Sequence, residues 1–483
     1  MLFNSVEFLL FLPVIFALYW FVFKKLIHQN ILILCASYFF YGWWDWRFLF
    51  LIIFSTLVDY SIGLLLQKEK VIRKRKILLW TSILVNLGLL GYLKYYNFFI
   101  DNFINAFASL GVEISESTLN IILPVGISFY TFQTLSYTID VYRKKIIPTN
   151  NFIAFATFVT FFPQLVAGPI ERATHLLPQF YKKRIFDYRN AVMGMRLILW
   201  GFFQKIVIAD GCAPYVNDIF ENYMNYSSAT LIFGSVLFSF QIYGDFAGYS
   251  NIAIGVSRLF GFDLMRNFKY PYFSRDIAEF WRRWHISLST WFRDYLYIPI
   301  GGSKGGKYSQ IRNVFVIFIV SGFWHGANWT FIVWGALNAL YFLPLLLLNK
   351  NRTHVDDFDS KTLFPTVKVF VQMCTTFILI TFAWIFFRSD NITVAIDFIK
   401  HIFVNSNYLK ISSAYTYNHN IRPLAVYLVF FILLEWFSRD REEFVNTFFE
   451  RNTYFRYAMY VIITLVIILN IQNEASGFIY FQF

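Results

Sequence analysis

The chain has 483 residues, of which 57% are hydrophobic, 22% aromatic and only 15% charged. A soluble domain averages about 25% charged residues, so this composition excludes an ordinary soluble protein, whose fold could not hide that much apolar surface. The net charge of +13 would suit a nucleic-acid-binding protein. We reject that function and expect no nucleic acid, because the basic residues lie in short loops between apolar runs, where they orient a membrane protein.

Apolar runs recur along the chain and predict an all-α, polytopic integral membrane protein. In chain order, the first five membrane spans are expected at residues 6–23, 29–43, 48–66, 77–100 and 119–141. Basic stretches follow the first, third and fifth of these, at residues 24–25, 68–76 and 143–145. By the positive-inside rule these three loops are cytoplasmic, and the parity of the spans then places the N-terminus outside.

Further apolar segments follow at residues 152–166, 191–209, 229–246, 314–348, 367–387, 423–437 and 457–471. Together the segments predict about 11 membrane spans, with re-entrant and interfacial helices beside them. We expect one membrane-embedded domain over residues 1–483, and a solvated connector at residues 350–361. The three cysteines, Cys35, Cys212 and Cys374, lie in apolar surroundings without metal-ligand spacing, so they predict neither a metal site nor a disulfide framework.

The apolar run at residues 314–348 contains a polar interruption, SGFWHGANW, at residues 321–329. A single span needs about 20 residues, so this longer run predicts a broken helix or two segments, interrupted near Gly322 and Gly326. His325 lies at the break. A titratable side chain at membrane depth is costly and indicates a functional site. The alternative is a histidine that a neighbouring helix satisfies.

Residues 275–298 predict an interfacial or re-entrant helix, because aromatic residues fall on one face at helical spacing and Arg282 and Arg283 fall on the other. His285 lies near the aromatic face. Two interpretations stay open for it. It is either a packed histidine of an interfacial helix or a polar group turned into a protein cavity, with the arginines facing a cytosolic polyanion.

The motif FWRRWHISLSTWFRDYLYIPIGG, followed by SGFWHGANWTFIVWGALNALY, resembles the signature of the membrane-bound O-acyltransferases. The resemblance is strongest to the bacterial branch that contains alginate and peptidoglycan O-acetyltransferases. Further matching stretches are SFYTFQTLSYTIDVYR, FFPQLVAGPIER, DFAGYSNIAIG and AWIFFRSDN. The resemblance covers most of the chain and is densest at about residues 120–340.

This resemblance implies a helical enzyme in the bacterial cytoplasmic (inner) membrane, built around a central tunnel. Its donor would be cytosolic acetyl-CoA, used as a substrate, with no tightly bound cofactor. The acetyl group would reach an extracytoplasmic glycan, either alginate-like exopolysaccharide or peptidoglycan, through a periplasmic or membrane-anchored partner with a Ser-His-Asp site. The invariant histidine of the family corresponds to His325, and its second polar position corresponds to His285. The alternatives are a different acyl group such as D-alanyl, a lipid acceptor, or a transporter of intact glycan or lipid.

O-acyl transfer needs a general base, and a neutral histidine suits that role. We therefore expect His325 to be the base, although a covalent acyl-histidine stays an alternative. His285 would position the thioester or the acceptor, or stabilise the oxyanion.

Trp324 and Asn328 are candidate substrate-binding residues, and on a continuing helix Asn328 would lie on nearly the same face as His325. The candidates for the coenzyme A phosphates are Arg282, Arg283, Lys304 and Lys307, for which membrane topology is the alternative explanation.

Overall fold

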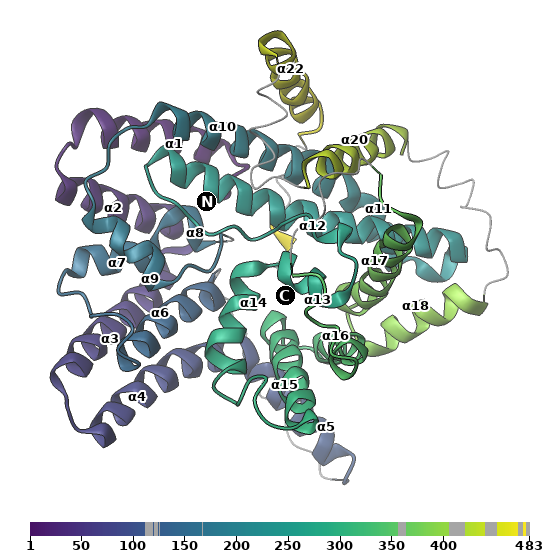
Figure 1. Ribbon diagram of the computed structural model, residues 1–483, viewed down its shortest axis with the longest axis horizontal. Helices are drawn as coiled ribbons and strands as arrows, with labels where there is room; N and C mark the ends of the chain where they lie inside the picture. The colour runs from purple at the N-terminus through teal and green to yellow at the C-terminus, as the bar shows by residue number, and fades with distance from the viewer. Residues whose placement is uncertain are drawn as a thin grey trace. The chain divides into compact units, whose positions relative to one another are not determined.

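The computed structural model describes residues 1–111, 119, 124, 126–166, 168–355, 364–404, 421–439, 452–471 and 477–479. These residues form helices and their connections, and no strand occurs among them, which confirms the predicted all-α class (Figure 1). The chain divides into two compact units. Unit 1 comprises Met1–Met195 and Ala253–Met265, and unit 2 comprises Arg196–Ile252 and Arg266–Phe483.

Unit 1 begins with the apolar helices of the first 110 residues. Their bounds are α1 Val6–Ala17, η1 Leu18–Val22, α2 Leu26–Asp45, η2 Trp46–Phe48, α3 Leu49–Lys68, α4 Ile72–Leu90, η3 Gly91–Tyr95 and α5 Tyr96–Ala108. It continues with α6 Ile127–Tyr142, α7 Phe152–Thr160, α8 Phe162–Leu165, α9 Ala173–Leu176 and η4 Leu177–Tyr181. The first part of the predicted fifth span, at residues 120–123 and 125, lies outside the described residues.

A buried carboxylate joins three helices of unit 1. Asp59 on α3 accepts hydrogen bonds from the Ser82 hydroxyl and the Asn86 amide of α4, at 2.5 and 2.8 Å, and from the Thr138 hydroxyl of α6 at 3.1 Å. A buried polar group is costly unless it is hydrogen-bonded. These contacts therefore fix the packing of α3, α4 and α6.

Unit 2 carries the residues that the sequence singled out. Two long helices, α10 Tyr188–Phe202 and α12 Ser228–Leu259, contribute residues to both units. The remaining helices are η5 Phe203–Ala209, α11 Asp210–Glu221, η6 Tyr223–Asn225, η7 Pro271–Phe273, α13 Ile277–Arg283, α14 Ile286–Phe292, η8 Arg293–Tyr297, α15 Lys307–His325, α16 Trp329–Leu347, α17 Val367–Arg388, α18 Ile392–Val404, α20 Arg422–Ser438 and α22 Thr453–Leu469.

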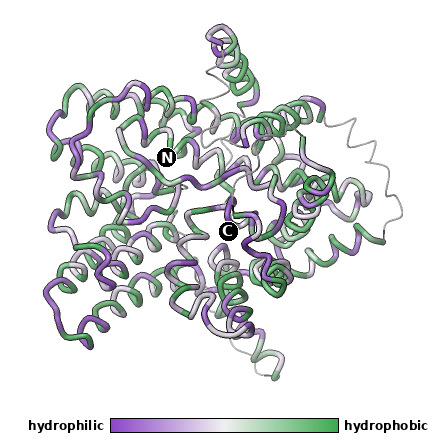
Figure 2. Tube along the Cα trace, viewed as in Figure 1, coloured by the Kyte–Doolittle hydropathy of each residue, from purple (hydrophilic) through white to green (hydrophobic). Residues whose placement is uncertain are grey.

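Six stretches of the described chain are long and apolar enough to cross a membrane, namely Leu26–Lys68, Ile72–Ala108, Tyr188–Glu221, Ser228–Leu259, Trp329–Leu347 and Val367–Arg388. Figure 2 shows the apolar character of these helices. Large apolar side chains point outward on them, and Phe50 and Leu84 keep 68% and 66% of their surface exposed. Such a surface suits lipid, which confirms a multi-pass membrane protein. The total of about 11 spans and the central tunnel stay predictions.

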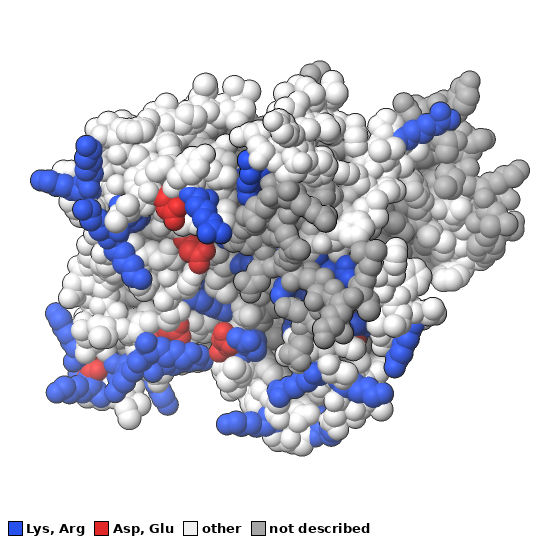
Figure 3. Space-filling model, turned by 45° about the horizontal axis from the view of Figure 1, so that its top comes forward, with Lys and Arg blue, Asp and Glu red and all other residues white. Residues whose placement is uncertain are grey.

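Two of the basic loops lie at the same end of unit 1. Arg75, at the start of α4, donates a hydrogen bond to the carbonyl oxygen of Tyr142, the last residue of α6, at 2.8 Å. The basic stretches at residues 68–76 and 143–145 are therefore neighbours, as a shared cytoplasmic location requires. Figure 3 shows a face on which lysine and arginine side chains far outnumber the acidic ones.

Candidate functional site

His325 lies at a helix break that two close helix contacts enforce. Helix α15 ends at His325, and α16 begins at Trp329. A Cβ atom on Gly322 would lie 2.2 Å from the carbonyl oxygen of Phe331, and one on Gly335 would lie 2.4 Å from that of Phe318. Glycines let membrane helices approach this closely. The predicted broken helix is confirmed, with its break at Gly326, while Gly322 lies inside α15.

The imidazole of His325 is 95% buried and surrounded by aromatic rings. Its ring centroid lies 4.9 Å from that of Trp324, 5.2 Å from that of Trp334 and 5.3 Å from that of Phe387. The rings of Trp334 and Phe387 meet the imidazole at steep angles of 86° and 73°. Trp334 of α16 and Phe387 of α17 thus line the imidazole at the end of α15.

His285 lies at a second break, which the sequence did not predict. The expected single helix at residues 275–298 is wrong, because α13 ends at Arg283 and α14 begins only at Ile286. His285 adopts a left-handed backbone conformation, with a φ of 44°, which is uncommon for a residue other than glycine. Backbone strain of this kind clusters at functional sites. The segment is also more buried than an interfacial helix, since Trp284, His285 and Leu288 are all buried.

Asn267 fixes the protonation form of His285. Its side-chain oxygen accepts hydrogen bonds from the Ser287 amide at 3.3 Å and the Ser287 hydroxyl at 2.7 Å, and it lies 3.3 Å from Nδ1 of His285. Because that oxygen is an acceptor, Nδ1 carries the proton and Nε2 is the nitrogen with the lone pair. Burial lowers the pKa of His285 to about 3, so the ring is neutral at physiological pH.

Trp324 brings the two histidines to one place. Its indole ring lies next to that of His325 and 6.2 Å from that of His285, measured between ring centroids. His285 also packs edge-on against Phe246 of α12, at 4.5 Å between ring centroids and 86° between ring planes. Of the predicted site residues, His325, His285 and Trp324 therefore form one aromatic-walled cluster inside unit 2. Sequence analysis had proposed the two histidines but not the tryptophan between them as their link.

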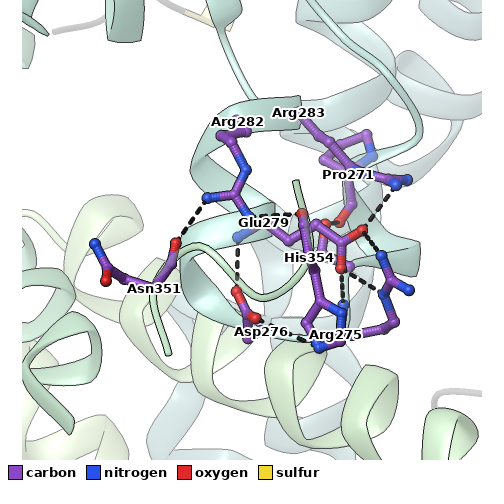
Figure 4. A network of polar contacts seen from close by, with 9 residues as sticks. Pro271, Arg275, Asp276, Glu279, Arg282, Arg283, Asn351 and His354 are labelled. Carbon is purple, nitrogen blue, oxygen red and sulfur yellow. Dashed lines mark hydrogen bonds and ion pairs between the residues drawn. The ribbon is translucent and has the colours of Figure 1, made fainter. Parts of the chain in front are cut away.

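Arg282 and Arg283 take part in a polar network on α13 (Figure 4). The Arg283 guanidinium lies 2.7 Å from Oε1 of Glu279, which also pairs with Arg275 at 2.9 Å. Arg282 donates hydrogen bonds to the carbonyl oxygens of Asn351 and His354, at 3.1 and 2.8 Å. Arg283 thus shares the carboxylate of Glu279 with Arg275. Arg282 is exposed and holds the described start of the predicted connector, whose residues 356–361 lie outside the described residues.

Asn328 and Lys307 have structural partners. The Asn328 side chain accepts the Thr330 amide at 3.0 Å, which caps α16, and donates to the carbonyl oxygen of Asp390 at 2.7 Å. Because α15 ends at His325, the expected alignment of Asn328 with His325 on one helical face does not arise. Lys307 contacts the end of α16 through the Leu346 carbonyl and the Asn349 side chain. Lys304 is exposed.

Sequence reasoning missed Asn267, Phe246 and the aromatic walls Trp334 and Phe387. Asn267 is fully buried in a loop that shows no periodicity, so only its contact with His285 identifies it. Trp334 and Phe387 belonged to expected membrane spans, where aromatic residues are ordinary. Among the described residues, no cluster of three or more histidine, cysteine or acidic side chains could hold a metal ion.

The histidine cluster lies in a part of the chain that resembles known proteins. The model of the membrane-bound O-acyltransferase family matches residues 143–387. A probable alginate O-acetylase of Pseudomonas aeruginosa is 40% identical over 398 residues, covering 82% of this chain and 73% of that protein. A peptidoglycan O-acetyltransferase of Helicobacter pylori is 34% identical and covers 83% and 79%. A teichoic acid D-alanyltransferase of Bacillus subtilis is 31% identical over a shorter region, covering 46% and 58%.

Proposed function

Because the chain belongs to the membrane-bound O-acyltransferase family, we propose that it passes an acetyl group from cytosolic acetyl-CoA toward the O-acetylation of an extracytoplasmic polysaccharide. The observation that carries this proposal is the cluster of two buried histidines against Trp324, within the region that the family model matches. The relatives named for alginate and peptidoglycan favour an extracytoplasmic glycan as the acceptor.

In the proposed reaction, His325 takes the proton from an acceptor hydroxyl, and the hydroxyl oxygen attacks the thioester carbonyl carbon. The tetrahedral intermediate then collapses, the carbon–sulfur bond breaks, and the leaving thiolate receives the proton from the His325 imidazolium. A neutral histidine in an apolar enclosure suits this proton transfer. The steep ring contacts with Trp334 and Phe387 hold the imidazole in place for both steps.

His285 has a different role in this proposal. With Nδ1–H directed at Asn267, its Nε2 can accept a hydrogen bond but cannot donate one, so this tautomer does not stabilise an oxyanion. A pKa of about 3 also makes it a weak base. We therefore assign His285 to orienting the acceptor hydroxyl. Of the roles that the sequence left open, this one fits the observed hydrogen bond.

Several further features belong to the proposal. The enzyme would lie in the bacterial inner membrane and deliver the acetyl group to a periplasmic or membrane-anchored partner with a Ser-His-Asp site. Among the basic candidates, Arg282 and Lys304 are exposed and would meet the coenzyme A phosphates. D-alanyl transfer receives less support, because the D-alanyltransferase relative matches less than half of this chain.

The test is acetyl transfer from radiolabelled acetyl-CoA in membranes that contain matched amounts of wild type, His325→Ala or His285→Ala. We expect label on protein, glycan or water with the wild type and a loss of at least about 1000-fold in rate for His325→Ala, comparable to the loss when a serine protease loses a member of its catalytic triad. His401→Ala, which changes a histidine of α18 outside the cluster, is the control. Near-normal transfer by His325→Ala would contradict the general-base role, and transfer only from a D-alanyl thioester would contradict the acetyl donor.

A further inference from the structure

Gly477, Phe478 and Ile479, close to the end of the chain, contact the interior of unit 2. Phe478 and Ile479 are 0% and 4% exposed. The Ile479 amide donates a hydrogen bond to Oδ2 of Asp245 on α12 at 2.6 Å, and the Lys205 ammonium of η5 lies 3.4 Å from the Gly477 carbonyl oxygen. Two backbone groups of the segment therefore engage charged side chains of two different helices.

The anchor of this segment is a buried ionic triad. Lys205 lies 2.8 Å from Asp210 and 2.6 Å from Asp245, and all three side chains are at least nine-tenths buried. Lys205 and Asp210 face each other although they are five residues apart, because η5 is a π-helix whose hydrogen bonds join residues i and i+5. One lysine does not balance two carboxylates, so the Ile479 amide supplies a further donor that buried charges require.

An unbroken series of ring contacts leads from this segment to the candidate site. The Phe478 ring lies 4.7 Å from that of Tyr249 and 5.5 Å from that of Phe246, both on α12. Phe246 also meets the imidazole of His285, at 4.5 Å between ring centroids. Phe478 therefore supports the ring against which His285 packs, while Asn267 contacts the imidazole through Nδ1.

We infer that Gly477–Ile479 is a positioning segment, which the Lys205–Asp210–Asp245 triad anchors and which holds His285 in place through Phe478 and Phe246. The inference rests on the proposed function for the role of His285 in transfer. It also explains why charged side chains of η5 and α12 are buried, since they anchor this segment. Packed interiors transmit small displacements, and a shift of about 1 Å in a positioning group can lower a rate by about 100-fold.

The experiment compares Phe478→Ala with Phe398→Ala in the full-length protein. Phe398 is an equally buried phenylalanine of unit 2, but its described ring contacts are with Phe220 and Tyr223, away from both histidines. We expect Phe478→Ala to lower kcat for acetyl transfer by at least about 10-fold, with the KM for acetyl-CoA within about twofold of wild type. Phe478→Met, which refills most of the volume, should restore kcat to within about threefold. Phe398→Ala should leave kcat within about twofold.

A second readout does not need the proposed activity. Diethyl pyrocarbonate carbethoxylates histidines, and mass spectrometry measures the rate at each site. Phe478→Ala should raise the modification rate of His285 by at least about fivefold and leave that of His401 unchanged. If both kcat and the His285 rate match wild type, the inference is overturned. If wild type shows no transfer from any thioester while the His285 rate still rises, the proposed function fails and the packing role stands.

Discussion

At the residue scale, Asn267 is the least expected part of the site. One amide oxygen serves three donors, and the same residue's backbone oxygen accepts the Ile286 amide at 2.9 Å. These contacts fix the start of α14 and the tautomer of His285 together. A single loop residue thus determines which imidazole nitrogen carries the proton.

We predict that Asn267→Ala lowers kcat by about 10- to 100-fold and changes the KM for acetyl-CoA by less than about twofold, because the wrong tautomer or ring orientation misplaces the acceptor. Steady-state transfer assays in membranes with matched protein levels provide the measurement. Asn30→Ala is the matched control, since Asn30 is an equally buried asparagine of unit 1 that contacts the Phe180 carbonyl and Arg184. Equal losses in the two variants would show that Asn267 acts only through stability.

At the element scale, the two helix breaks explain what the sequence could and could not predict. The break after His325 was visible, because polar residues and glycines interrupt a run too long for one span. The break at His285 was invisible, because an aromatic face repeats at helical spacing through residues that the structure divides between α13 and α14. Periodicity reports side-chain pattern, whereas the positive φ of His285 depends on contacts with the distant Asn267.

Most membrane helices agree with the expected apolar segments, because apolar length is the strongest signal in such a sequence. The same signal did not show their ends: α12 extends to Leu259 and the helix from Tyr188 continues to Glu221, both well beyond the apolar cores. Both histidines were named from the sequence. Their shared contact with Trp324 depends on how α15 meets α14, which no local pattern records.

A second element-scale feature is the short helix α9, where His175 lies between two carboxylates. Nδ1 of His175 is 2.8 Å from Glu171, and Nε2 is 3.5 Å from Asp263, which follows α12. The contacts with Asp263 and Glu171 raise the pKa of His175 to about 10. Because the pKa of His175 in the folded protein exceeds the ordinary histidine value of 6.5, the stabilisation is fully present below pH 6.5 and is lost as the pH rises through about 10.

We predict that His175→Gln lowers the melting temperature in detergent near neutral pH by a few degrees, and that the difference from wild type disappears as the pH rises past about 10. The effect is modest because 37% of the His175 side chain is exposed, so solvent screens the pairs. Thermal unfolding of both proteins across this pH range is the measurement. A difference that stays constant to high pH would mean that His175 contributes through packing alone.

At the scale of the whole molecule, the distribution of charge sets the orientation in the membrane. The Arg75–Tyr142 contact places two basic stretches at one end of unit 1. The opposite ends of α2 and α3 meet at η2, where Arg47 pairs with Asp45 and stays exposed. The positive-inside rule then assigns the basic stretches to the cytoplasm and η2 to the outside.

We predict that a membrane-impermeant maleimide labels Arg47→Cys in intact cells but labels Lys74→Cys only after the membrane is opened. Both native side chains are exposed, with 62% and 66% of their surface accessible, so reagent access depends on the side of the membrane. The unsubstituted chain, with its three native cysteines, gives the background. Labelling of Lys74→Cys in intact cells would reverse the proposed orientation. The basic stretches would then face away from the cytosol, where the proposed donor acetyl-CoA is found.

The π-helix η5 has an evolutionary consequence. A π turn contains one residue more than the α-helical turn that it replaces, so the segment behaves as an inserted residue that the Lys205–Asp210 pair holds in place. A lineage that deleted one residue between Lys205 and Asp210 would regain a regular helix in which the two residues are four apart and, at about 100° per residue, still lie on one face. The pair would therefore survive the deletion, so the extra residue and the three ionic positions can be gained or lost independently.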